Sequence, residues 1–116
     1  LNNVVYQRFF EHIVVKFLTG PCGLDLMTAP VITFAAESSC RFLKPLSYPS
    51  PVVAGIRIDH MGRTSARYGL ALFEAGDDRA AAEGHWVHVF VDRASGRPVP
   101  IPDAVRAVFE AHRRIS

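Results

Sequence analysis

Residues 1–21 read LNNVVYQRFFEHIVVKFLTGP, and this stretch predicts a helix from Val4 to Leu18 around which the rest of the chain is organised. Either Asn2 or Asn3 can cap its first turn, because a short side-chain oxygen accepts a backbone N–H that has no partner within the helix. Gly20 and the proline after it predict where the helix ends.

The apolar side chains of this helix cover far more than the usual stripe when they are placed at 3.6 residues per turn. The polar positions left to face water are Gln7, Arg8, Glu11, His12 and Lys16. A long, strongly curved sheet wrapped around the helix would bury such a surface. The alternative is an amphipathic helix lying on an ordinary α+β sheet, and the pattern alone does not decide between the two.

Composition limits the class of protein. The chain has 116 residues, of which 49% are hydrophobic, so we expect one domain with its own core. Cys22 and Cys40 show no metal or redox spacing, which favours reduced thiols in a cytoplasmic protein, with a single disulfide as the alternative. A net charge of +2 is too small for phosphate neutralisation along nucleic acid. No apolar run approaches the ~20 residues that span a bilayer, and no signal peptide is expected.

Four stretches after the helix alternate apolar and polar residues, as half-buried strands do. They are residues 31–43, 52–61, 64–74 and 80–91. Short turns between successive strands predict an antiparallel meander. The prolines of the turn region 44–51 cannot donate to a ladder, and a closing helix is predicted at 104–112, with Arg106, Arg113 and Arg114 facing water.

The two outer strands carry further expectations. The first is expected to bury Ile32, Phe34, Ala36, Cys40 and Phe42 and to expose the residues between them. The last is bulky on both faces from Trp86 to Val91, so a second layer, for example another subunit, is expected to cover it.

Several short motifs occur in a fixed order. An Asn-Asn-x-x-Tyr sequence ends at Tyr6, and FLKPL at 42–46, GRTS at 62–65 and GRPVPIP at 96–102 follow. With this order and spacing, essentially the whole chain resembles the hotdog-fold acyl-CoA thioesterases of the 4-hydroxybenzoyl-CoA thioesterase type. The resemblance implies an α+β hotdog fold, in which an antiparallel β-sheet wraps around a central α-helix, with a C-terminal helix.

The family motif is Asp-x-x-Gly-His-x-Asn-Asn-x-x-Tyr, and its Asp, Gly and His would lie upstream of Leu1. We therefore expect residues 1–116 to be a single hotdog thioesterase domain whose first strand and catalytic carboxylate precede residue 1. An inactive relative is the alternative. Glu37 is the alternative acid, although most strand glutamates simply face solvent.

The resemblance implies hydrolysis of an acyl-CoA to a free acid and coenzyme A. The backbone N–H of Asn3 would then stabilise the oxyanion, because the first N–H groups of a helix are free and its dipole favours negative charge there. Asn2 and Tyr6 lie beside it in the motif. Without the resemblance, the two asparagines would be assigned as helix caps and Tyr6 as a packing residue.

Substrate contacts are expected from residues at or near turns. Basic groups can grip the phosphates of coenzyme A and hydroxyls its pantetheine arm, and the candidates are Lys44, Arg63, Ser65 and Arg67. The histidines lack metal-ligand spacing, so neither metal nor cofactor is expected. The expected partners are the acyl-CoA substrate and further copies in a homodimer or homotetramer, with no nucleic acid and no membrane. A non-catalytic protein that binds acyl-CoA or acyl-carrier protein is the alternative function.

Overall fold

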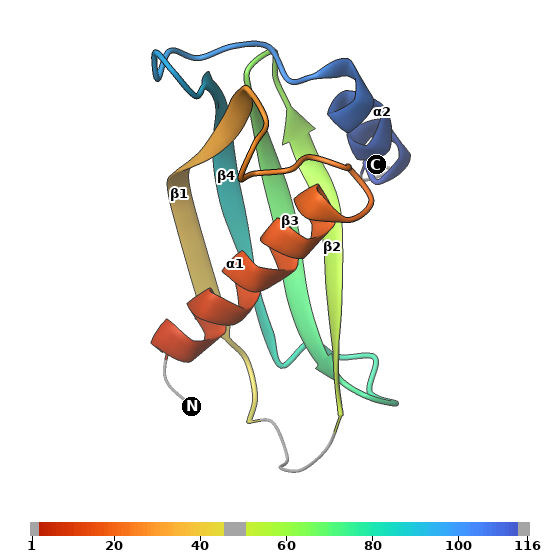
Figure 1. Ribbon diagram of the computed structural model, residues 1–116. Helices are drawn as coiled ribbons and strands as arrows, with labels where there is room; N and C mark the ends of the chain where they lie inside the picture. The colour runs from red at the N-terminus through yellow and green to blue at the C-terminus, as the bar shows by residue number, and fades with distance from the viewer. Residues whose placement is uncertain (1–2, 46–50, 114–116) are drawn as a thin grey trace.

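The computed structural model describes residues 3–45 and 51–113, with side chains from Tyr6 onward. Four strands form one antiparallel sheet, and both helices pack on the same face of it (Figure 1). The elements are α1 (Asn3–Thr19), β1 (Val31–Phe42), β2 (Val52–Met61), β3 (Ser65–Glu74), β4 (Ala82–Asp92) and α2 (Asp103–Ala111). Each predicted element is confirmed, with bounds that agree within two residues. Among the described helices, none combines the length and apolar composition needed to cross a bilayer.

The strand order is β1-β4-β3-β2. The predicted meander is confirmed for β2, β3 and β4, which are consecutive antiparallel neighbours, but it is wrong for β1. This strand pairs with β4 from Val31 opposite Asp92 to Phe42 opposite Ala82, so β1 is an edge strand whose backbone pairs along one side. The chain then crosses to β2 at the far edge, through a segment whose residues 46–50 lie outside the described ones.

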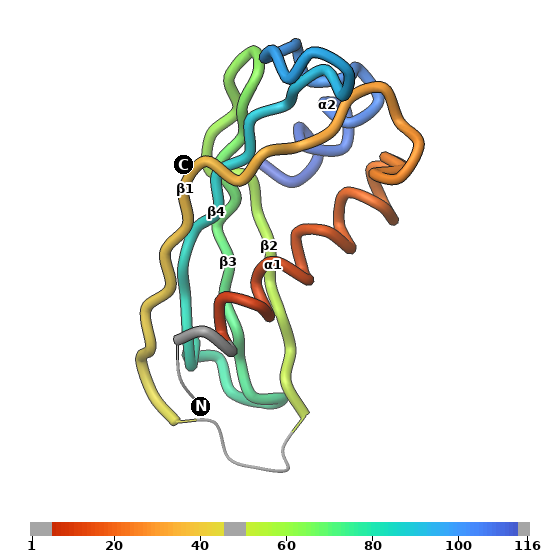
Figure 2. The backbone as a smooth tube through the Cα atoms, turned by 60° about the vertical axis from the view of Figure 1, so that its left-hand side comes forward, coloured from red at the N-terminus to blue at the C-terminus, as the bar shows by residue number. Residues whose placement is uncertain are grey.

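Helix α1 runs diagonally across one face of the curved sheet and stands to one side of it (Figures 1 and 2). Its buried side chains are Tyr6, Phe10, Val14, Phe17 and Leu18. Phe9 and Val15 are 46% and 36% exposed, so the expectation that only polar positions of this helix face solvent is wrong. A single curved layer contacts one side of a helical cylinder, which is why the far side of α1 stays open. The hotdog arrangement implied by the resemblance is confirmed.

Helix α2 closes one end of the core. Phe109 is fully buried, with its ring centroid 5.9 Å from that of Phe17, 5.7 Å from that of Tyr68 and 6.1 Å from that of Phe90. These four rings join α1, α2 and the sheet into one aromatic cluster.

The expectation that Arg106 faces water is wrong. Its guanidinium donates to the carbonyl oxygens of Gly62, at 2.8 Å, and Arg63, at 3.2 Å, and so ties α2 to the turn between β2 and β3. Arg113 is exposed as expected and pairs with Glu110, whereas Arg114 lies outside the described residues.

A β-bulge changes which residues of β1 face the core. The register with β4 shifts between Ala35 and Glu37, so one extra residue exchanges the two faces of the strand on either side of it. Phe34 lies opposite Val89 on the face turned away from α1 and is 63% exposed. The expectation that Phe34 is buried is therefore wrong, and Ala36 and Phe42, the latter 46% exposed, are not buried either. Beyond the bulge, Cys40 does pack against the core.

One histidine is buried within the core. The Nε2 atom of His88 lies 3.0 Å from Trp86 Nε1, and its Nδ1 atom lies 3.1 Å from the Tyr68 hydroxyl. Because the indole N–H can only donate, Nε2 must accept, and Nδ1 then carries the proton that it donates to the tyrosine oxygen. This pairing requires a neutral imidazole, and burial lowers the pKa of His88 to about 4.

We expect the buried His88 to make the protein acid-sensitive. An unfolded histidine titrates near pH 6.5, so between that value and about pH 4 the unfolded chain binds a proton that the folded chain excludes. Its contribution to stability is present above pH 6.5 and is lost as the pH falls through this window, by up to about 3 kcal/mol. Urea unfolding of the wild type and of His88→Asn between pH 7.5 and 4 measures the effect. The two stabilities should converge as the pH falls, and parallel curves would contradict the assignment.

Candidate active site

The first turn of α1 forms the positive end of a helix. The helix begins at Asn3 and carries no acidic residue in its first turn. The first backbone N–H groups of a helix have no intrahelical acceptor, and the macrodipole adds a partial positive charge there. This end of α1 lies beside the end of β1 (Figure 1), and the Tyr6 ring centroid lies 5.8 Å from that of Phe42. Negative charge that develops beside it would be stabilised.

Two protonated groups adjoin this helix end. Tyr6 is 2% exposed, and burial, with a smaller contribution from nearby Cys40, raises the pKa of its phenol. Burial also raises the pKa of the Cys40 thiol. At neutral pH these side chains are therefore a hydroxyl and a thiol rather than a phenolate and a thiolate. Together with Phe42, they supply an apolar wall and a hydrogen-bond donor, but not a base.

The residues predicted to hold the substrate do not converge within one chain. Lys44 lies toward the same end of the sheet as Tyr6, where its ammonium group pairs with Asp77. Arg63 and Ser65 lie at the opposite end, in and after the turn between β2 and β3. Ser65 and Arg67 alternate along β3 with buried core residues, so their side chains point to the sheet face away from α1. Asn2 lies outside the described residues, as does the side chain of Asn3.

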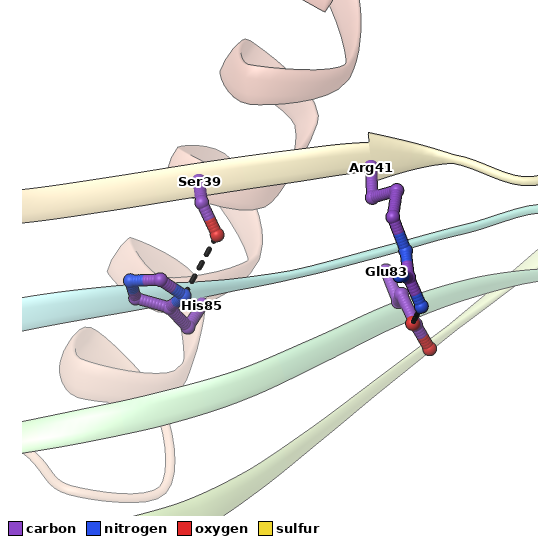
Figure 3. A network of polar contacts seen from close by, with 4 residues as sticks. All are labelled: Ser39, Arg41, Glu83 and His85. Atoms are coloured by element: carbon purple, nitrogen blue, oxygen red, sulfur yellow. Dashed lines mark hydrogen bonds and ion pairs between the residues drawn. The ribbon is translucent and has the colours of Figure 1, made fainter.

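Glu37 is also separated from the helix end. Its carboxylate lies 2.6 Å from His85 Nε2, on the face opposite α1. Figure 3 shows His85 and Ser39 in front of the sheet, with α1 behind it. The sheet therefore stands between Glu37 and the N-terminus of α1 in the same chain. This placement disfavours Glu37 as the acid at that helix end.

The same outer face carries an open groove of about 770 Å³. Gly69 forms part of its floor, opposite Arg57 on β2 and His85 on β4. A Cβ atom at Gly69 would come within 2.6 Å of an Asp59 carboxylate oxygen and 2.8 Å of Arg57 Nε, so the ion pair between these two residues leans over the glycine. Sequence periodicity does not predict this groove or the place of His85 in it, because both depend on which strands are neighbours.

Comparison with known proteins identifies the family. The thioesterase-like superfamily matches residues 1–109, almost the whole chain. The chain belongs to this superfamily. The search of curated proteins found no match to this chain.

Solved structures of related proteins agree with the superfamily assignment. PA5185 of Pseudomonas aeruginosa is 39% identical, with a TM-score of 0.94 over 99% of this chain and 80% of its own. PA2801 of the same organism, named as a candidate thioesterase, is 30% identical, with a TM-score of 0.83 over 91% of this chain and 82% of its own. The gentisyl-coenzyme A thioesterase BH1999, at 23% identity, shares the fold with a TM-score of 0.78 over 95% of this chain and 86% of its own.

Proposed function

We propose that this protein is an acyl-CoA thioesterase that hydrolyses an acyl-CoA to a free acid and coenzyme A at the N-terminus of α1. The observation that carries the proposal is a helix start without acidic residues, set beside the apolar wall of Tyr6 and Phe42, in a chain of the thioesterase-like superfamily. Thioester cleavage creates negative charge on the carbonyl oxygen, and helix N–H groups stabilise such charge without a side chain.

The groups of this chain then have distinct roles in the proposed site. The backbone N–H of Asn3 donates to the developing oxyanion, and Asn2 caps and orients the same turn. Tyr6 lines the acyl pocket with its ring. The carboxylate that attacks the thioester, or that takes a proton from the attacking water, belongs to a first strand and catalytic loop upstream of Leu1. We propose residues 1–116 as a single hotdog thioesterase domain.

Coenzyme A binding is assigned to Lys44, Arg63, Ser65 and Arg67. Since Lys44 and Arg63 lie at opposite ends of the sheet, one substrate can meet both only if two protomers contribute to its site. A homodimer or homotetramer is therefore part of the proposal. On the open side of α1, Phe9 and Val15 are exposed among polar side chains, and a second copy could contact them. We place the protein in the cytoplasm, in keeping with its free cysteines.

The test is release of the coenzyme A thiol from a panel of acyl-CoA esters by the protein with its natural N-terminal region. Lys44→Ala and Arg63→Ala are each expected to raise KM for acyl-CoA about tenfold or more, since each removes a charge-assisted contact. Both variants should leave KM unchanged for a short thioester that lacks the nucleotide. Equal losses on the two substrates would remove these residues from the coenzyme A site. Tight binding of acyl-CoA without hydrolysis would instead establish the non-catalytic alternative.

A further inference from the structure

A second group of reactive side chains lies on the sheet face away from α1. Ser39 and His85 are directly opposite each other in the ladder between β1 and β4, although 46 residues separate them in sequence. The Ser39 hydroxyl oxygen lies 2.7 Å from His85 Nδ1, and His85 Nε2 lies 2.6 Å from a carboxylate oxygen of Glu37. Figure 3 shows Ser39 reaching from β1 to the imidazole on β4. Serine, histidine and glutamate thus form one continuous hydrogen-bonded chain.

The chemistry of these groups fixes the direction of the hydrogen bonds. A carboxylate only accepts, so in neutral His85 the proton is on Nε2. The lone pair is then on Nδ1, and the Ser39 hydroxyl is the donor across the 2.7 Å contact. The Ser39 hydroxyl proton therefore points at Nδ1 of His85, while Nε2 of the same ring donates to the Glu37 carboxylate. A nucleophile is activated in this way when a base accepts its proton and a third group orients that base.

We propose that Ser39 is the nucleophile of a second acyl-transfer site, with His85 as its general base and Glu37 as the residue that positions His85. In the first step Ser39 Oγ attacks the carbonyl carbon of an ester, and its proton passes to His85 Nδ1. The bond to the leaving alcohol breaks, and the alcohol departs with that proton. Water then attacks the acyl-serine ester, its proton passes through His85 to Ser39 Oγ, and a carboxylic acid is released.

The groove in front of these residues indicates the class of substrate. Its volume of about 770 Å³ suits a small ester, and Ser39 and His85 both line it. Arg41 and Arg67 also line it. Arg41 lies two residues from Ser39 on the same face and pairs with Glu83 (Figure 3). Guanidinium groups bind carboxylates and stabilise a developing oxyanion, so we expect a small ester that carries a carboxylate.

A fluorophosphonate, which reacts with activated serine hydroxyls, tests the proposal on the folded protein. Mass spectrometry should locate the label on Ser39, and Ser39→Ala should abolish it. Ser38→Ala is the matched control, because the neighbouring serine lies opposite Trp86 and points to the other face, so its loss should leave labelling intact. His85→Gln removes the base and is expected to slow labelling about 10²-fold or more. A folded wild type that takes up no label, or takes it up at another residue, would overturn the proposal.

The role of Glu37 needs a readout other than stability. Glu37→Gln keeps an acceptor for the Nε2 proton but removes the charge that stabilises the imidazolium, so labelling should slow about tenfold or more at an unchanged unfolding midpoint. In Ser39→Cys, which keeps a nucleophile in place, iodoacetamide should alkylate residue 39 before Cys22 and Cys40. Wild-type labelling rates in Glu37→Gln, or no preference for the new thiol, would reduce the three residues to a polar link between strands.

Discussion

Phe109→Ala is expected to lower the free energy of unfolding by about 3–5 kcal/mol, the cost of emptying a fully buried aromatic site. The Phe109 ring is 0% exposed and lies among those of Phe17, Tyr68 and Phe90. Its removal would therefore leave a cavity that neither water nor a small shift of the neighbouring rings fills. It is also a principal anchor of α2. A helix of 9 residues is not stable by itself in water, so loss of the anchor should release α2 from the sheet.

Urea unfolding followed by circular dichroism measures this loss. Phe34→Ala is the matched control, because it makes the same change on the outer face of β1, where the side chain is 63% exposed. Its expected cost is below about 1 kcal/mol. Total stabilities of small domains are typically only about 5–15 kcal/mol, so the two variants should be easily separated. Similar losses in both would mean that the aromatic cluster around Phe109 does not anchor the core.

Local periodicity was enough to predict the elements. In β3, the residues Ala66, Tyr68, Leu70 and Leu72 alternate with polar or small ones, and all four are buried. Alternation of this kind is a property of the strand itself and needs no knowledge of its neighbours. The same holds for α1, whose start and end are marked by the asparagines and by the Gly-Pro pair.

The pairing of the strands and the register of β1 could not be predicted from the sequence. The bulge in β1 falls at Ala35 and Ala36, where no glycine or proline marks an extra residue, and it turned the predicted burial of Phe34 into exposure. A meander in sequence order also placed β1 beside β2 rather than beside β4. With that order, Ser39 and His85 would not meet. The helix end could therefore be proposed from local residues, whereas the groove on the outer face could not.

The proposed role of the Asn3 backbone can be tested with proline, which removes the N–H group itself. Because α1 begins at Asn3, that N–H makes no intrahelical bond. Proline is well accepted at the first position of a helix, since its fixed φ suits the helix and its missing donor is not needed there. Asn3→Pro should therefore lower kcat for acyl-CoA by about 10²–10³ while the fold is kept.

Asn3→Ala is the matched variant, because it removes the side chain and keeps the N–H. Its expected cost is below about 0.5 kcal/mol of stability, because the proposed cap is Asn2, with little change in kcat. Both variants should be assayed in the protein with its natural N-terminal region, alongside their unfolding midpoints. Wild-type activity in both variants would show that the main chain at this position is not the oxyanion donor. Equal loss in the two would transfer the role to the asparagine side chain, so only a gap of about two orders of magnitude between proline and alanine supports the helix-end mechanism.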